Sequence, residues 1–330
     1  MNMTALLSAI NYKPLSYYLT SDFMLPIILK ALAVGLLVCL CCSLLGTSLV
    51  LKRFSMIGDG LSHTGFGALA VASVMGATGA AYHITLPIVT ITAFFLLRTG
   101  ENSKIRGDTA IAVLSTGAVA FGSLLFNFSD QRFADLCNSL FGSAGIFTIS
   151  NADLVFSILV SVAVLVLFVV FYNRIFAVTF DETYAGASGI NASLYKSLIA
   201  VLTAVTVVVG MKMMGSIMIS GLIIFPALAA MRVCKSFKGV VIGSALIGVA
   251  CFLMGFFTAI CIGFQTGPTV IVFNVLVFLI FTAVGFIRNT VKRRKNEKLP
   301  FTKQEISGFI LIGICVAAVI ALIAWIAVSV

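Results

Sequence analysis

Long apolar runs dominate the chain, and short polar segments separate them. A transmembrane helix needs about 20 mostly apolar residues. By this criterion the pattern predicts ten membrane spans, at residues 24–51, 55–76, 80–97, 107–126, 151–172, 196–212, 215–231, 239–262, 268–288 and 306–330. The sixth and seventh runs adjoin at Met211–Ser216, which predicts a tight turn or a broken helix there. The predicted fold class is therefore all-α, a polytopic transmembrane helix bundle of about ten spans.

The basic residues follow this pattern of spans. If residues 1–23 lie outside and the spans alternate, all but four of the 21 Lys and Arg residues fall in inner loops. Positive residues collect in the short cytoplasmic loops of membrane proteins. This threading predicts a multi-pass cell-membrane protein with both termini outside. It divides the chain into an extracellular N-terminal segment (1–23), a transmembrane domain of nine spans (24–288), a basic cytoplasmic linker (289–305) and an additional transmembrane helix (306–330).

Composition agrees with a membrane protein and excludes other classes. Hydrophobic residues make up 61% of the chain and charged residues 10%, whereas soluble domains have about 25% charged residues. The net charge of +10 would indicate nucleic acid in a soluble protein. Here the basic residues follow the inner loops, so we expect contact with anionic membrane lipid and no nucleic-acid partner. Neither a Gly-Lys-Ser/Thr phosphate loop nor an HExxH motif occurs, so we expect a transporter and not an enzyme.

Two ionisable residues, Asp59 and His63, interrupt the second predicted span. Positions i and i+4 share one face of a helix, so both side chains can approach one ligand. Ionisable groups inside a membrane are costly and often functional. A carboxylate oxygen and an imidazole nitrogen are suitable ligands for a divalent transition metal. In the structural alternative, Asp59 caps a helix that begins at Gly60 and His63 donates to a neighbouring carbonyl. The pair by itself leaves both possibilities open.

Glycine and proline residues mark positions where helices can touch or bend. The candidate packing or gating positions are Gly58, Gly60, Gly65, Pro226, Gly267 and Pro268. The glycines of the second span allow close helix contact or access of a ligand to the backbone. Pro226 removes a backbone hydrogen bond, which predicts a kink in the seventh span, either static or used in gating. Pro268 lies near the first turn of the ninth span, where proline is favourable.

The inner segment from about residue 173 to 196 is longer than two adjacent helices require. Within it, Asp181–Gly189 predicts a short amphipathic helix ended by Gly189, and Asn191 begins the next element. A structured inner loop of this type indicates a docking surface for a soluble partner; a helix lying on the membrane surface is the alternative. On the outer side, residues 127–150 have the spacing of a short interfacial or re-entrant helix.

Four motifs in a fixed order give the chain a family resemblance. They are Leu51–His63, with a basic pair, Gly-Asp and Ser-His; Leu140–Ser143; Thr179–Gly189; and Met211–Ala230, followed by Gly267–Pro268. Over roughly residues 24–288 the sequence resembles the membrane permease subunits of zinc and manganese ATP-binding-cassette (ABC) importers. The resemblance implies a fold similar to the vitamin-importer (type II) ABC permeases.

The resemblance also implies roles for particular residues. Asp59 and His63 match the positions that face the translocation pathway and can contact the metal. The positions that match the loop docking into the ATPase are Phe180, Asp181, Ala185 and Gly189. Such a permease works as a dimer with two cytosolic ATPase subunits and receives metal from an extracellular metal-binding protein. The divalent metal is then cargo, and no permanently bound cofactor is expected.

The ion and the energy source have alternatives. Many manganese-type members have a proline shortly after the histidine, where this chain has Thr64–Gly67, and this difference favours zinc over manganese. An ion-coupled secondary transporter would use Asp59 as its proton carrier; such carriers often contain inverted repeats, and no convincing repeat is found here. An ABC importer of a chelated metal or a vitamin is the third possibility.

Overall fold

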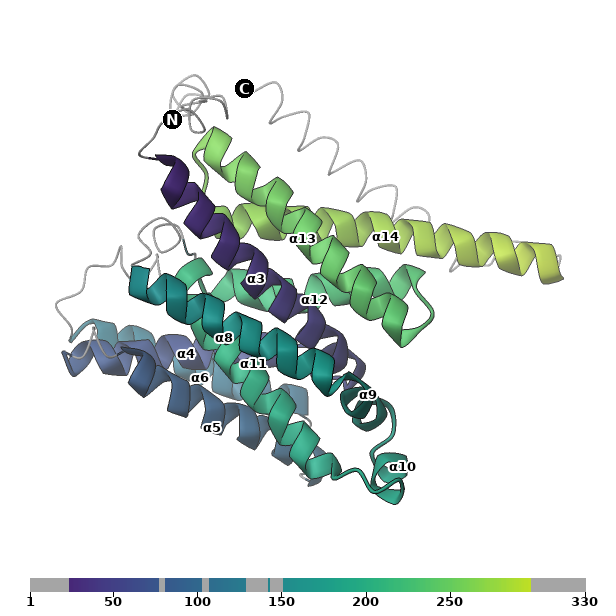
Figure 1. The fold of residues 1–330 in the computed structure, drawn as a ribbon, viewed down its shortest axis with the longest axis horizontal. Helices are drawn as coiled ribbons and strands as arrows, with labels where there is room; N and C mark the ends of the chain where they lie inside the picture. Colours follow the sequence, from purple (N-terminus) through teal and green to yellow (C-terminus); the bar gives the residue numbers. More distant parts are fainter. Residues whose placement is uncertain (1–23, 77–80, 103–106, 129–141, 143–150, 298–330) are drawn as a thin grey trace.

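The computed structural model describes residues 24–76, 81–102, 107–128, 142 and 151–297 of the 330-residue chain. In these ranges the chain is a bundle of helices without strands (Figure 1). The helices are α3 (Met24–Leu51), α4 (Ile57–Val74), α5 (Ala81–Asn102), α6 (Gly107–Phe126), α8 (Asn151–Val170), α9 (Tyr172–Phe180), α10 (Glu182–Ala187), α11 (Ala192–Met214), α12 (Ser216–Val233), α13 (Phe237–Ile262) and α14 (Thr266–Glu297).

Seven of the described helices are long and apolar enough to cross a membrane: α3, α6, α8, α11, α12, α13 and α14. Helix α5 contributes a shorter apolar stretch, His83–Leu97. Helix α4 has 18 residues and is not among the seven; it carries Asp59 and His63 in its first two turns. The predicted number of ten spans is therefore not confirmed. The proposed tenth span, 306–330, and the N-terminal segment, 1–23, lie outside the described residues.

Helices α11 and α12 form the most buried part of the bundle. Helix α12 packs against α3, α4, α13 and α14, while α11 packs against α3, α4 and α5. Helices α4, α5 and α6 lie together on one side, and α13 and α14 lie on the other (Figure 1). Helix α4 therefore has protein neighbours on several sides. Ionisable side chains in membrane proteins usually face such protein surroundings and not the lipid.

Glycines set how closely α4 and its neighbours approach. A Cβ on Gly58 would lie 2.9 Å from Ile223 Cδ1 of α12, and a Cβ on Gly60 would lie 2.8 Å from Ile111 Cγ2 of α6. At Gly65 it would lie 2.8 Å from Met211 Cε of α11. These distances are shorter than real Cβ contacts allow. The small residues of the second predicted span thus let three different helices pack directly on α4.

The break between the sixth and seventh predicted spans falls at Gly215, which separates α11 from α12. Its φ of 85° suits glycine, because other residues are strained at positive φ. Gly142, with φ +71°, lies against this junction: a Cβ there would be 2.0 Å from the Met214 carbonyl oxygen. Gly142, which belongs to one of the four sequence motifs, thus contacts the point where the helix is broken.

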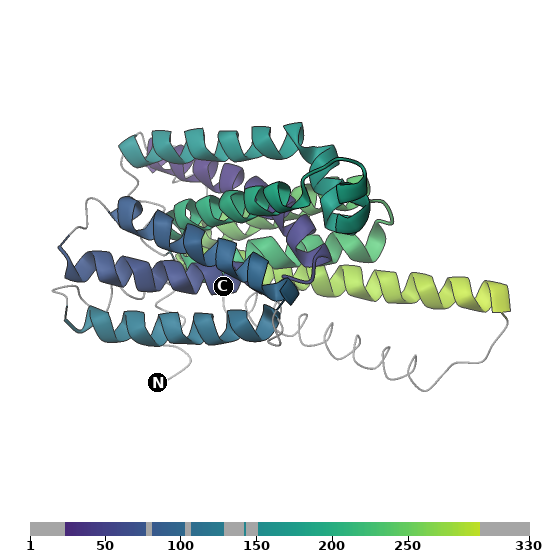
Figure 2. The same ribbon diagram turned by 90° about the horizontal axis from the view of Figure 1, so that it is seen from below.

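Several boundaries differ from the sequence prediction. The segment 173–196 is helical over most of its length, because it holds α9, α10 and the start of α11. Helix α14 continues to Glu297, through much of the predicted linker 289–305 (Figure 2). The Lys, Arg and Glu residues of that run favour a helix, and its first proline is Pro300. At 32 residues α14 is about 48 Å long, so it exceeds the hydrocarbon core of about 30 Å.

Candidate functional site

Asp59 and His63 lie one turn apart at the start of α4, and their side chains meet. His63 Nε2 is 3.3 Å from Asp59 Oδ1. Ser115 of α6 donates from Oγ to Asp59 Oδ2 over 3.3 Å. The Asp59 side chain is 33% exposed and the His63 side chain 19% exposed, so the pair is partly open to its surroundings. One carboxylate and one imidazole are thus held together without being sealed in the core.

The structure argues against the capping alternative for Asp59. Helix α4 begins at Ile57, before Asp59, and its N-cap residue is Met56, which makes no side-chain capping bond. His63 Nδ1 is buried and has no hydrogen-bond partner among the described residues, so His63 does not donate to a neighbouring carbonyl from that nitrogen. Nε2, which faces Asp59, is therefore the nitrogen of His63 that can meet a ligand together with the carboxylate.

The pair provides few ligands. No group of three or more His, Cys, Asp or Glu side chains that could hold a metal occurs in the described part of the chain. Two protein ligands leave most positions of a divalent ion to water or to another chain. Such a pair is suited to brief contact with an ion and less suited to storage.

Asp59 and His63 lie near one end of their helix. Asp59 is the third residue of α4 and His63 the seventh, which places them about 3 Å and 9 Å along the axis at 1.5 Å per residue. Lys52, in the turn before α4, reaches Glu182 of α10 over 2.8 Å. The pair therefore lies towards the end of the bundle that also carries α9 and α10.

Helix α10 forms where the sequence predicts a short helix, and both of its ends are well defined. Asp181 is its N-cap and accepts hydrogen bonds from the backbone N–H groups of Thr183 and Tyr184, at 2.9 and 3.0 Å. The Thr183 hydroxyl and these N–H groups lower the pKa of the Asp181 carboxyl. At the other end Ile190 N–H donates to the Ala185 carbonyl, and Gly189 has a φ of 78°, as in a Schellman motif.

The residues predicted to form the docking loop have different surroundings. Phe180 is 60% exposed, and Asp181 and Gly189 are also exposed. Ala185 is fully buried and packs with Val178 and Tyr195, so it holds α10 to the bundle and does not face outwards. Tyr184 is 67% exposed, and the sequence analysis did not single it out. Phe180 and Tyr184 are therefore the most exposed aromatic side chains of α9 and α10.

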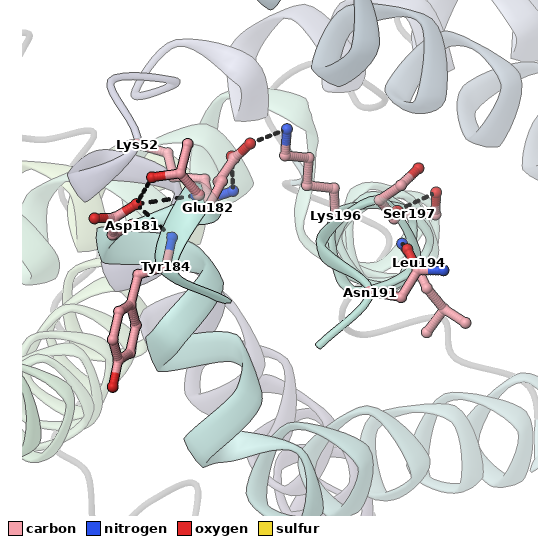
Figure 3. A network of polar contacts seen from close by, with 10 residues as sticks. Lys52, Asp181, Glu182, Tyr184, Asn191, Leu194, Lys196 and Ser197 are labelled. Atoms are coloured by element: carbon pink, nitrogen blue, oxygen red, sulfur yellow. Dashed lines mark hydrogen bonds and ion pairs between the residues drawn. The ribbon is translucent and has the colours of Figure 1, made fainter. Parts of the chain in front are cut away.

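Glu182 was also missed, because a glutamate in an inner loop gives no signal in the sequence. Its carboxylate pairs with Lys52 over 2.8 Å and with Lys196 of α11 (Figure 3). Partial burial raises the pKa of the Glu182 carboxyl, but the hydrogen bonds from Lys196 and Lys52 outweigh it, and the net pKa is lowered. Glu182 is therefore a charged bridge between three elements.

The remaining predicted positions lie elsewhere in the bundle. Pro226 is buried within α12, which continues through it without interruption. Gly267 is buried and Pro268 half-buried in the first turn of α14, which packs against α12. His83, which the sequence analysis assigned no role, is the second of the two histidines of the chain and is exposed near the start of α5. The proline and glycine positions thus belong to the packing around α12. Ser115, which the sequence did not indicate, is an additional side chain in contact with Asp59.

Comparison with known proteins places the chain in a family. The model of the ABC 3 transport family matches residues 24–285. The manganese import system permease protein ScaB of Streptococcus gordonii is 25% identical over 265 residues, covering 80% of this chain and 94% of the relative. The chelated iron transport system membrane protein YfeD of Yersinia pestis is 26% identical over 291 residues, covering 86% and 93%.

Solved structures give the same assignment. The structure of PsaBC from Streptococcus pneumoniae in complex with Fab matches with a TM-score of 0.69 and 25% sequence identity, covering 81% of this chain and 93% of that chain. The chain belongs to the ABC 3 transport family and is a membrane permease subunit of an ABC importer. A permease subunit of this kind is not itself an enzyme.

Proposed function

We propose that this permease forms the translocation pathway of an ATP-driven importer of divalent transition-metal ions, with zinc favoured and manganese next. The observation that carries the proposal is the Asp59–His63 pair, with its atoms 3.3 Å apart and partly exposed. Its family supports import, and the names of its relatives support a metal as cargo. The preference for zinc rests on Thr64–Gly67 replacing a proline after the histidine.

In the proposed mechanism the pair makes it easier for the ion to shed water. Asp59 supplies charge and an oxygen ligand, while His63 supplies a nitrogen ligand through Nε2, the ring nitrogen that faces Asp59. A second copy of the chain would present the same pair across the pathway. Because one chain contributes only two ligands, a single pair holds the ion weakly enough to release it.

The proposal assigns the α9–α10 end of the bundle to the cytoplasm. Phe180 and Tyr184 there present exposed rings to a cytosolic ATPase subunit, and Asp181 and Gly189 define the helix that carries them. Each of the two permease copies takes one ATPase. An extracellular metal-binding protein delivers the ion at the opposite face. The complex lies in the cell membrane, with both termini of the permease outside.

Metal uptake into vesicles tests this function. The permease and its ATPase are reconstituted with ATP enclosed on the ATPase side, the metal-binding protein is added on the opposite side, and uptake of zinc and of manganese is measured. We expect the paired substitution Asp59→Ala with His63→Ala to lower uptake to less than about a tenth of the wild-type rate, because both protein ligands are lost. His83→Ala removes the exposed histidine of α5 and should leave uptake unchanged.

Other results would identify an alternative. Unchanged uptake in the paired variant would overturn the role of Asp59 and His63. Uptake driven by a proton gradient in vesicles without the ATPase would indicate a secondary transporter. Uptake of iron or zinc only when a chelator is bound to it would favour a chelated-metal importer, as the name of the Yersinia pestis relative suggests.

A further inference from the structure

The two ion pairs of Glu182 join α10 to two other elements at once. Glu182 Oε1 is 2.8 Å from Lys52 Nζ, and Oε2 pairs with Lys196 Nζ, so each carboxylate oxygen serves a different lysine. The Lys52 side chain is only 8% exposed and that of Lys196 17% exposed, whereas the Glu182 side chain is 35% exposed. Ion pairs that are partly shielded from water are screened less than pairs on an open surface. Glu182 thus joins the two lysines through partly buried ion pairs.

The Lys52 end of this link is attached to the start of α4. Lys52 lies in the turn between α3 and α4, where Phe54 N–H donates to the Leu49 carbonyl over 2.9 Å and Arg53 N–H to the Val50 carbonyl over 3.1 Å. These two bonds form a Schellman cap that fixes the turn. Helix α4 begins at Ile57, directly after it. A force on Lys52 is therefore passed to the helix that carries Asp59 and His63.

The Lys196 end of the link is attached to α11. Lys196 lies in the first turns of α11, which packs against α4 and α5. Helix α11 also contacts α4 farther along, where Met211 lies close to Gly65, so both lysines connect Glu182 to elements next to the helix that carries the pair. A movement of α10 relative to only one of these elements would break one ion pair. The two pairs therefore favour movement of α10, the α3–α4 turn and the start of α11 as one unit.

The opposite side of α10 is free to meet a partner. Tyr184 is 67% exposed and points away from the two lysines (Figure 3). Glu182 faces the bundle, where Ala185 also anchors the helix. Helix α10 therefore has an outward aromatic side chain and an inward carboxylate. A displacement of α10 by a partner that binds its outer side would therefore also displace Glu182 and the two lysines paired with it.

We propose that Glu182 is a positioning residue for transport, which passes the displacement of α10 through Lys52 and Lys196 to the start of α4 and so to Asp59 and His63. The inference rests on the proposed function, because it requires an ATPase that moves α10. Glu182 does not contact the metal. Its contribution is to keep ATP hydrolysis linked to the opening and closing of the metal site.

The amount of zinc or manganese transported for each ATP hydrolysed tests this role. Wild-type, Glu182→Gln and Glu182→Asp permeases are reconstituted with the ATPase, and both quantities are measured in the same vesicles. We expect Glu182→Gln to lower the ratio of metal to ATP by about tenfold, while the ATPase still copurifies. Glu182→Asp keeps the charge and should restore most of the ratio. A role limited to fold stability would lower the amount of assembled complex and leave the ratio unchanged.

The lysines supply a second measurement. Lys52→Met should lower the ratio in the wild-type background and add less than about a twofold effect to Glu182→Gln, because both substitutions remove the same link. Asp153→Asn neutralises a half-buried carboxylate at the start of α8, at the far end of that helix from α9, and should leave the ratio unchanged.

A wild-type ratio of metal to ATP in Glu182→Gln would overturn the inference while leaving the proposed function in place. Loss of ATPase binding in Glu182→Gln would overturn it as well, because Glu182 would then serve docking. If wild-type vesicles took up neither metal with ATP, the proposed function would fall together with the inference.

Discussion

At the scale of single residues, the sequence indicates which side chains carry the chemistry but not what surrounds them. Asp59 and His63 stand out because they are ionisable residues in an apolar run four positions apart. Ser115 does not stand out, since serine is common in membrane helices. Its role depends on α6 packing against α4, a contact between distant segments that no local pattern predicts.

Ser115 orients the carboxylate of Asp59, so its removal should weaken transport. We expect Ser115→Ala to lower metal uptake about tenfold at limiting metal, because groups that orient a ligand often matter to this extent. Ser123→Ala is the matched control, since Ser123 lies on the same helix and donates only to its own turn, at the Ala120 carbonyl. Equal uptake in the two variants would show that the 3.3 Å contact has no role. Uptake by vesicles at several metal concentrations gives the answer.

The carboxylates of Asp181 and Glu182 predict how stability depends on pH. Both have a pKa below the ordinary value, Asp181 through hydrogen bonds from Thr183 and Tyr184 and Glu182 through its lysines. Their stabilisation is fully present above the ordinary pKa of about 4, and is lost as the pH falls through the lower pKa of the folded state. The melting temperature of Glu182→Gln should therefore approach that of the wild type as the pH drops below about 4. A difference that stays constant from pH 7 to pH 3 would contradict this.

At the scale of elements, local signals predict helix ends better than helix lengths. The break at Gly215, the cap at Asp181, the stop at Gly189 and the start after Asn191 all follow from residue types with specific backbone preferences. Asn191 accepts a hydrogen bond from Leu194 N–H, as an N-cap residue should. The predicted span 268–288 agrees with the apolar span Thr266–Arg288, but hydropathy marks only where a span leaves the membrane and does not predict that α14 continues as a helix to Glu297.

The contact of Gly142 with the α11–α12 junction predicts a severe effect of one methyl group. Gly142→Ala introduces a left-handed residue, which costs about 1–2 kcal/mol, and a Cβ 2.0 Å from the Met214 carbonyl oxygen. We expect a lower melting temperature and reduced metal uptake. Gly117→Ala is the control: a Cβ there meets nothing within 4 Å, and alanine favours the helix by about 0.5–1 kcal/mol. If Gly142→Ala were as stable as the control, the close contact would be wrong.

At the scale of the whole molecule, the sequence predicts the class and the approximate order of spans. The alternation of charge and hydropathy is a global pattern, so small errors at helix ends do not disturb it. It does not predict which helices are central. The buried positions of α11 and α12 arise from glycines and small residues that meet across distant segments, such as Gly46, where a Cβ would lie 2.0 Å from the Ile223 carbonyl oxygen.

The orientation of the bundle can be tested with single cysteines. Tyr184→Cys on α10 should react with a membrane-impermeant maleimide only after the cells are permeabilised, whereas Phe128→Cys, 80% exposed after α6, should react in intact cells. Native Cys39, Cys42 and Cys251 are buried and should add little labelling. Labelling above the wild-type level is measured in both conditions. The reverse pattern would place α10 outside and contradict docking of a cytosolic ATPase.

Arg53 shows a conflict between inserting this protein and folding it. It adopts a φ of 63° at the Schellman cap after α3, a position where glycine is the usual residue. An arginine there is strained by about 1 kcal/mol relative to glycine. In the proposed orientation the same arginine, next to Lys52, belongs to the positive charge that would hold this turn on the inner side while the chain enters the membrane. Arg53→Gly should therefore make the finished protein harder to melt and also increase the fraction of chains inserted the wrong way round. With arginine and not glycine at this position, the sequence retains a positive charge for insertion at a small cost in the stability of the folded protein.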